Sequence, residues 1–258
     1  MAGKWFIKTI SGKTVSNGIV ISYCYYTLII VIRSRKYENV YEIKNKGEIT
    51  NMNTIIYLVK HAEELEEKGI KNTNESSQLM NEKYILSVKG EEQAKELSEN
   101  AELQNIDILW SSSYSRAKGT AKYIAYKNNL DINIDSRLNE RKLGSIEDLA
   151  KWMEGKRYGV VQAYLLDRTY KGRDGESCEE ATQRVSEFLN FILEDYKGKR
   201  IALVSHGALL SFLLTNWCEL NEDVKLIWNN KIIEIKEPSI TKLTFDDGKI
   251  INIESINI

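Results

Sequence analysis

The chain has only two histidines, and each follows directly after a short apolar run. His61 comes after residues 54–59 and Lys60, and His206 comes after residues 200–205. Continuous apolar runs of this length are typical of parallel strands that are buried on both faces. An imidazole can serve as a nucleophile, a general base or a general acid near neutral pH. Two strand ends that each present one histidine therefore predict a single site built from both.

A third polar segment follows another apolar run. Residues 106–110 read as a strand, residues 111–116 are five hydroxyl side chains and Arg116, and a helical pattern comes next. The amino end of a helix favours an anion, because its backbone N–H groups are unpaired. In a mostly parallel sheet, ligands bind beyond the carboxyl ends of the strands. That edge is expected to collect these groups: Lys60, His61, the hydroxyls of residues 111–115, Arg116, His206 and Gly207.

Two imidazoles, two cations and several hydrogen-bond donors fit a tetrahedral dianion such as a phosphate group. A neutral imidazole nitrogen can attack phosphorus, while Arg116, Lys60 and a protonated His206 hold the oxyanion charge. The leaving alkoxide then needs a proton, which Glu140 could supply before it activates water for a second step. Two other carboxylates, Glu63 and Glu64, are less favoured for this role.

Each of these residues also has a simpler explanation. A histidine at a strand end is usually a hydrogen-bonded polar residue, and Arg116 alone would read as a solvated or ion-paired helix residue. Glu140 has no claim from spacing alone, since the chain has many carboxylates. The equivalent positions of the two histidines favour the catalytic interpretation.

Helical patterns occur between the apolar runs. Ser87 is a candidate cap before an apolar stripe, and a second stripe covers residues 117–125. Ser177 with Glu180 three residues later predicts a capping box before a long amphipathic helix. Shorter helices are expected over residues 147–154, 158–167, 208–217 and 222–229. Residues 147–175 look like an inserted lid.

Further strand signals complete the pattern. Residues 132–134 suggest an edge strand, and residues 239–245 and 250–256 flank Asp247 and Gly248, a strong hairpin signal. Alternating strands and helices imply a mostly parallel sheet with right-handed crossovers. The fold class predicted is a three-layer α/β/α domain with a mostly parallel central sheet, plus an N-terminal β-rich extension.

The first 51 residues differ from the remainder, being rich in Ile, Val, Tyr and Thr. The apolar run at residues 18–32 is shorter than the roughly 20 residues that a spanning helix needs. A β-rich extension is therefore favoured over a membrane anchor. We expect residues 1–51 to form an extension of uncertain role and residues 52–258 the functional domain, which could equally begin at Met52.

Composition narrows the partners. A formal net charge of -1 provides no basic field that would attract nucleic acid. The three cysteines, Cys24, Cys178 and Cys218, are far apart and lack a paired motif, which favours reduced thiols and the cytoplasm. The histidines and cysteines show no metal-ligand spacing, so neither a metal nor another cofactor is expected.

The motifs together resemble the histidine phosphatase superfamily, which includes the cofactor-dependent phosphoglycerate mutases. The resemblance runs from about residue 53 to residue 245 through five motifs in the family's order. They are Lys60-His61-Ala62, the segment of residues 86–94, Ser111-Ser112 with Arg116-Ala117 and Thr120-Ala121, Leu138-Asn139-Glu140 with Gly144 and then Gly175-Glu176-Ser177, and Val204-Ser205-His206-Gly207.

The resemblance implies the family's fold and roles for individual residues. His61 would be the phosphorylated nucleophile and Glu140 the proton donor, with His206 as the third catalytic residue. Lys60, Arg116, His206 and Gly207 would line the phosphate pocket. The expected partner is a small phosphorylated substrate.

Two residues depart from the family's Arg-His-Gly motif. Lys60 stands where a guanidinium would grip phosphate in a fork, and Ala62 replaces a glycine. Three hypotheses follow: a phosphomonoester phosphatase, a mutase that moves phosphate between hydroxyls, and a weakened phosphate-binding sensor or partner module. The phosphatase is preferred because Lys142 stands where mutases of similar sequence carry a histidine.

Substrate identity depends on residues 63–84 and 144–175, whose loops surround the site in this scheme. Arg157, Arg168 and Arg173 are candidates for a second anionic group, although solvated surface arginines are the more common case. The sequence does not indicate an oligomeric state.

Overall fold

The computed structural model describes residues 53–65 and 77–257, together with the backbone of four strands within residues 1–52. The chain divides into two compact units, Met1–Met52 and Asn53–Ile258. Within the first unit, β1 (Phe6–Thr9), β2 (Gly18–Cys24), β3 (Thr27–Arg33) and β4 (Glu38–Lys44) pair antiparallel in chain order. The role of residues 1–51 and a functional domain starting at residue 52 stay predictions. Among the described residues, none of the helices has the length and apolarity to span a bilayer.

The second unit is built on a six-stranded sheet in the order β13-β12-β5-β8-β6-β7. The strands β5 (Thr54–Lys60), β8 (Arg200–Ser205), β6 (Ile108–Ser111) and β7 (Ile132–Ile134) run parallel. The hairpin of β12 (Ser239–Asp246) and β13 (Lys249–Ile256) adds antiparallel strands beside β5. The prediction of a mostly parallel α/β sheet is confirmed, and so is the predicted hairpin.

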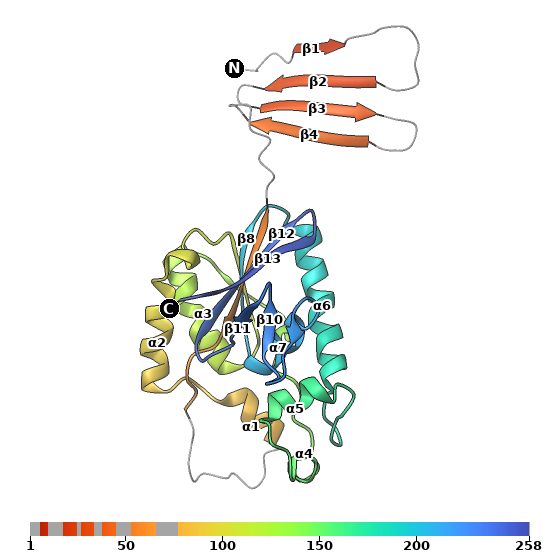
Figure 1. Ribbon diagram of the computed structural model, residues 1–258. Coiled ribbons are helices and arrows are strands. Elements are labelled where there is room, and N and C mark those ends of the chain that lie inside the picture. Colours follow the sequence, from red (N-terminus) through yellow and green to blue (C-terminus); the bar gives the residue numbers. More distant parts are fainter. Residues whose placement is uncertain are drawn as a thin grey trace. The chain divides into compact units, whose positions relative to one another are not determined.

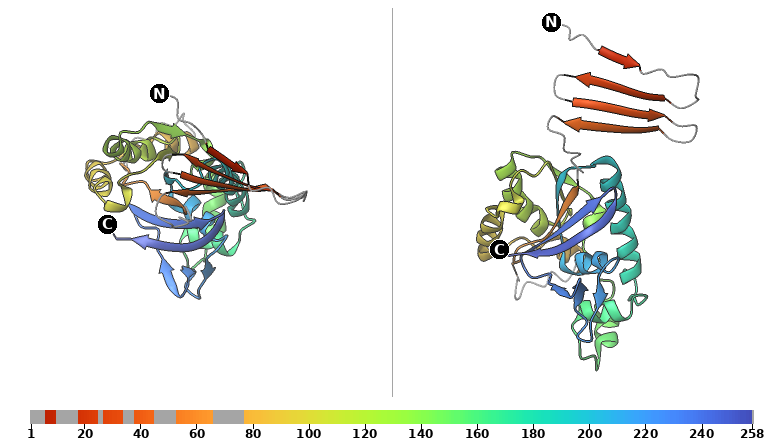
Figure 2. Two further views of the ribbon diagram at one scale, coloured as in Figure 1. Left: turned by 90° about the horizontal axis from the view of Figure 1, so that it is seen from above. Right: turned by 45° about the horizontal axis from the view of Figure 1, so that its top comes forward.

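Helices cover both faces of this sheet (Figures 1 and 2). Tyr57 and Val59 face one core cluster with α2 (Val88–Ser98) and α3 (Ser115–Asn128). Ile56 and Leu58 face the other cluster with α6 (Cys178–Asp195) and α7 (Gly207–Leu214). Since successive strand residues point to opposite faces, burial on both sides explains why β5 and β8 read as continuous apolar runs.

The helix starts follow the predicted caps. The Ser87 side chain accepts a hydrogen bond from the N–H of Gly90 at the start of α2. Ser177 and Glu180 form a capping box at the start of α6, as predicted. Two short 3-10 helices, η1 (Ala101–Leu103) and η2 (Ser136–Leu138), follow α2 and β7.

Three further helices gather at one end of the domain: α1 (Ser77–Lys83), α4 (Ile146–Met153) and α5 (Val160–Leu166) (Figure 1). The helices predicted within residues 147–154 and 158–167 are confirmed. Half of the predicted long loop at residues 63–84, namely residues 66–76, lies outside the described residues.

The helix predicted over residues 222–229 is wrong. The chain forms a small antiparallel sheet there, with β9 (Glu219–Leu220), β10 (Leu226–Trp228) and β11 (Lys231–Ile233). Asn229 and Asn230 both have positive φ angles, 48° and 62°, which turns the chain between β10 and β11. The side-chain oxygen of Asn221 accepts hydrogen bonds from the backbone N–H groups of Asp223 and Lys225, which competes with a helix.

Candidate active site

His61 lies at the carboxyl end of β5, and its backbone N–H continues the pairing with β8 by donating to Ser205 O at 3.0 Å. The ring is buried, and its Nδ1 lies 2.8 Å from the carbonyl oxygen of Ala62. A carbonyl only accepts hydrogen bonds, so Nδ1 carries the proton and Nε2 keeps its lone pair. This tautomer is the one in which Nε2 can act as a nucleophile.

Arg116 points at that lone pair from the first turn of α3. Its Nε donates to His61 Nε2 at 3.1 Å and lies 2.9 Å from Glu64 Oε2. Its terminal nitrogens donate to the backbone oxygen of Asn81 and, at 3.1 Å, to Asn81 Oδ1. The Arg116 side chain is 3% exposed, and these contacts fix the direction of its guanidinium group. The predicted pair of His61 and Arg116 is therefore brought together.

His206 is fully buried at the N-cap of α7. Its ring centroid lies 5.1 Å from that of His61, and the two rings meet edge to face. His206 Nε2 lies 2.8 Å from Ser112 Oγ, which itself donates to Asn139 Oδ1 at 2.9 Å. Since the Ser112 proton is used in that bond, Nε2 of His206 is the donor to Ser112. The two histidines thus share one site, as their strand-end positions predict.

The two imidazoles are neutral at neutral pH. Burial, with the nearby Arg116 cation, lowers the pKa of His61 to about 3. Burial, followed by His61 and Arg116, holds the pKa of His206 well below its usual range. The protonated His206 expected from the sequence is therefore not the form that this environment favours by itself. A phosphate dianion beside the ring would favour the protonated form.

Glu140 lies at the amino end of α7. Its carboxylate accepts hydrogen bonds from the backbone N–H groups of Ala208 at 3.2 Å, Leu209 at 3.1 Å and Arg141 at 2.8 Å. Of the two alternatives, Glu63 binds Ser87 and Lys89 on the side of α2. Glu64 forms an ion pair with Arg116, the residue that donates to His61. This contact was not predicted from the sequence, which indicated Glu64 only as a less favoured proton donor.

The two departures from the family motif have different consequences. Lys60 Nζ forms an ion pair with Glu237 Oε2 at 3.0 Å, and a Cβ atom placed on Gly207 would lie 3.2 Å from Lys60 Cε. Ala62 is not among the described residues with positive φ, and its N–H donates to Thr120 Oγ1 at 3.0 Å. The alanine therefore fits its backbone conformation without strain.

The three arginines proposed to bind a second anionic group of the substrate lie in different surroundings. Arg168 donates to Thr215 Oγ1 at 2.9 Å and to Thr182 Oγ1 at 3.3 Å, which commits it to α6 and α7. Arg157 is exposed between α4 and α5. Arg173 lines a pocket of about 580 Å³ together with Gln78, whose Nε2 donates to Tyr114 Oη at 2.6 Å. Tyr114 packs edge to face on His206, so this pocket borders the site.

Sequence reasoning missed several residues of the site. Glu237 pairs with Lys60, Asn139 holds Ser112, and Thr120 holds the backbone after His61. Asn139 and Thr120 stand inside recognised motifs, which was the available signal, whereas no pattern around Glu237 indicated its place. Within the described part of the chain, no group of three or more His, Cys, Asp or Glu side chains could hold a metal ion.

The fold and the buried pair of histidines define a class of α/β proteins with two histidines at the carboxyl ends of adjacent parallel strands. The sequence model of the histidine phosphatase superfamily (branch 1) matches residues 56–258. The chain belongs to this superfamily and is phosphoglycerate mutase-like. The family resemblance found in the sequence is confirmed.

Comparisons with individual proteins agree with this assignment. The chain is 32% identical over 203 residues to a Salmonella arizonae protein named "Probable phosphoglycerate mutase GpmB", covering 75% of this chain and 86% of that one. The crystal structure of phosphoglycerate mutase from Bacillus anthracis superposes with a TM-score of 0.59 at 20% identity, covering 79% and 92% of the two chains. The structure of a mycobacterial glucosyl-3-phosphoglycerate phosphatase gives a TM-score of 0.57 at 20% identity, covering 79% and 97%. At such identities the structural likeness shows the fold alone.

Proposed function

We propose that this protein is a phosphomonoester hydrolase that acts on a small phosphorylated metabolite through a phosphohistidine on His61. The observation that carries the proposal is the fixed tautomer of His61. Its Nδ1–H is bound to Ala62 O, and its Nε2 lone pair faces Arg116 beside the second buried imidazole. The lone pair accepts a hydrogen bond from a buried cation that a phosphate group would also attract, which suits a nucleophile that is released when the substrate binds.

The reaction balances in two steps. The first step requires Glu140 to carry a proton when the substrate is bound: His61 Nε2 attacks phosphorus, the P–N bond forms, the ester P–O bond breaks, and the protonated Glu140 gives its proton to the departing alkoxide. In the second, Glu140 takes a proton from water, whose oxygen attacks phosphorus while the P–N bond breaks. Arg116, Lys60, His206 and the N–H of Gly207 would hold the phosphoryl oxygens. These steps use side chains and backbone of the chain itself.

The state of the cysteines supports the cytoplasm as the place where the protein acts. Cys178 and Cys218 are free and buried in the structure, as suits a reducing compartment. The 32% identical relative named as a probable phosphoglycerate mutase supports a phosphorylated metabolite as the substrate class.

The test is to mix the protein with phosphate esters and to measure free phosphate and acid-labile, base-stable phosphorylation of His61. We expect net phosphate release from an aryl phosphate, and we expect His61→Ala to abolish both signals. A wild-type protein that shows neither would refute the proposal. If Lys60→Arg, which restores the guanidinium, is also inactive, the sensor hypothesis is supported instead.

A second candidate function is mutase-type phosphotransfer, which the name of the 32% identical relatives favours. The two activities separate with 3-phosphoglycerate as substrate and a bisphosphorylated primer present. Isomer formation without net release of phosphate would replace the hydrolase proposal with the mutase. Phosphate release without isomer formation supports the hydrolase.

A further inference from the structure

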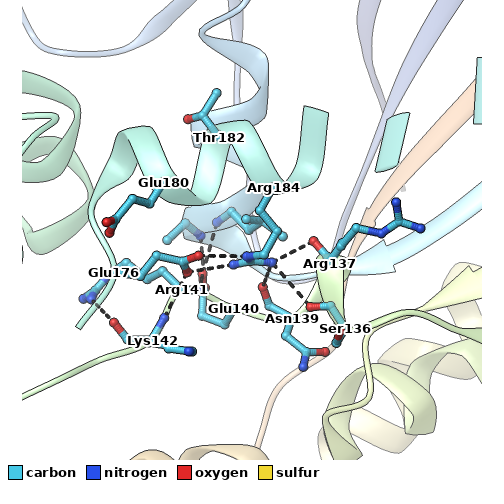
Figure 3. A network of polar contacts seen from close by, with 12 residues as sticks. Ser136, Arg137, Asn139, Glu140, Arg141, Lys142, Glu176, Glu180, Thr182 and Arg184 are labelled. Atoms are coloured by element: carbon cyan, nitrogen blue, oxygen red, sulfur yellow. Dashed lines mark hydrogen bonds and ion pairs between the residues drawn. The ribbon is translucent and has the colours of Figure 1, made fainter. Parts of the chain in front are cut away.

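Arg184 on α6 forms hydrogen bonds with the backbone of the segment that carries Glu140. Its Nη1 donates to the backbone oxygens of Arg137 at 2.7 Å, Asn139 at 3.1 Å and Ser136 at 3.4 Å. Figure 3 shows the guanidinium directed at these carbonyl groups. One side chain thus fixes the backbone on the amino-terminal side of Glu140.

Glu176 completes the arrangement on the other side. It receives Arg184 in a two-pronged ion pair, with Nε to Oε1 and Nη2 to Oε2 both at 2.8 Å. The same Oε2 accepts the backbone N–H of Lys142 at 3.2 Å. The side chains of Arg184 and Glu176 are 23% and 12% exposed, so solvent screens this pair only in part. Figure 3 places Glu140 between the two held ends of residues 136–142.

The same segment also reaches the second histidine. The Asn139 side chain accepts from Ser112 Oγ, and Ser112 contacts His206 Nε2. Arg184 holds the backbone oxygen of this same Asn139. A shift of residues 136–142 would therefore move Glu140 and loosen Ser112 beside His206 together.

We propose that Arg184 and Glu176 are positioning residues that hold Glu140 within reach of the leaving oxygen. This inference rests on the proposed function, since it assumes that Glu140 donates the proton in the first step. In the proposed mechanism, neither Arg184 nor Glu176 contacts the substrate. A pair that only stabilised α6 would not need to bind four backbone groups on both sides of one carboxylate.

The leaving group supplies a readout that separates positioning from stability. An alkoxide is a poor leaving group and needs the proton from Glu140 as the P–O bond breaks. An aryl oxide with electron-withdrawing substituents leaves as a stable anion and needs that proton much less. Misplacing Glu140 should thus slow alkyl phosphates selectively, whereas partial unfolding slows both ester types equally.

The experiment compares kcat/KM for an alkyl phosphate and a nitrophenyl phosphate in wild type, Arg184→Met, Glu176→Gln and Val185→Ala. Val185 is buried in the core on the same helix, and its aliphatic side chain cannot donate a hydrogen bond to the carbonyl groups that Arg184 binds, so its variant serves as a control for lost stability. For Arg184→Met we expect about a 100-fold loss with the alkyl ester, the effect of about 1 Å of misplacement, and a loss of a few-fold with the aryl ester. Glu176→Gln keeps the size of the side chain and should show the same selectivity with a smaller loss.

The outcomes are distinct. Selective loss with the alkyl ester in either variant, absent in Val185→Ala, supports the positioning role. Equal loss with both esters in Arg184→Met and Glu176→Gln, parallel to their melting temperatures, overturns it while the hydrolase function stands. A wild-type protein that forms no phosphohistidine and releases no phosphate overturns the function and this inference together.

Discussion

If Lys60 binds the substrate phosphate as proposed, Glu237 would compete with phosphate for its ammonium group, and replacing Glu237 tests this role of Lys60. Lys60 Nζ and Glu237 Oε2 are 3.0 Å apart, and the side chains are 17% and 35% exposed. A phosphate group drawn to Lys60 must break or share this ion pair. We therefore expect Glu237→Gln to strengthen the binding of inorganic phosphate.

The size of the effect follows from the exposure of the pair. Partly exposed ion pairs contribute up to about 1 kcal/mol, which corresponds to about fivefold in a dissociation constant. The inhibition constant of inorganic phosphate, measured against an aryl phosphate substrate, should fall by about that factor in Glu237→Gln. The same change in 0.5 M salt should be smaller, because salt screens partly exposed charges.

A matched control separates the loss of the Lys60–Glu237 ion pair from the loss of one negative charge. Glu234 lies close to Glu237 in the chain, is paired with Lys236 at 2.6 Å and loses the same charge in Glu234→Gln. In a Lys60→Gln background, Glu237→Gln should add nothing beyond this control. The reasoning is refuted if Glu234→Gln has an equal effect, or if the gain persists without Lys60.

Three further predictions concern the neighbours and charge state of His61. Ala62→Gly should lower stability by about 0.5 to 1 kcal/mol in urea denaturation without raising kcat, because Ala62 has no positive φ for a glycine to relieve. Both histidines have lowered pKa values in the fold, that of His61 to about 3, while an unfolded histidine titrates near about 6.5. The unfolded chain then binds more protons, so stability should fall as pH decreases from about 6.5 toward about 3, by up to about 1.4 kcal/mol per pH unit for each ring, and His61→Gln should flatten this dependence. Gly90→Ala should lower both the melting temperature and kcat, because its Cβ would lie 2.0 Å from Glu63 O and displace the backbone after His61, at a cost of about 1 to 3 kcal/mol.

Most of the fold could be predicted because its signals are local. Burial on both faces produces the apolar runs of β5 and β8, and the Ser177 capping box marks the start of α6 within four residues. The helix prediction for residues 222–229 was wrong because β10 is defined by its pairing with β9 and β11. Its apolar residues, Leu226 to Trp228, suit a helix or a strand equally when the partner strands are unknown.

The candidate site was predictable to the extent that strand ends converge. His61, Arg116 and His206 follow parallel strands, so topology alone brings them to one edge. The partners of the charged groups come from parts of the chain far away in sequence: Glu237 precedes β12, and two of the N–H groups that bind Glu140 belong to α7. No periodicity links such positions.

These partners change how the site must work. Lys60 is bound to Glu237, Arg116 to His61 and Glu64, and Glu140 to the amino end of α7. In the proposed mechanism, a phosphate dianion that binds Arg116 would draw the guanidinium away from the His61 lone pair and so free that nitrogen for attack. If the proposal holds, substrate binding and activation of His61 are the same event, and the hydrogen bond from Arg116 occupies the lone pair of His61 until phosphate binds.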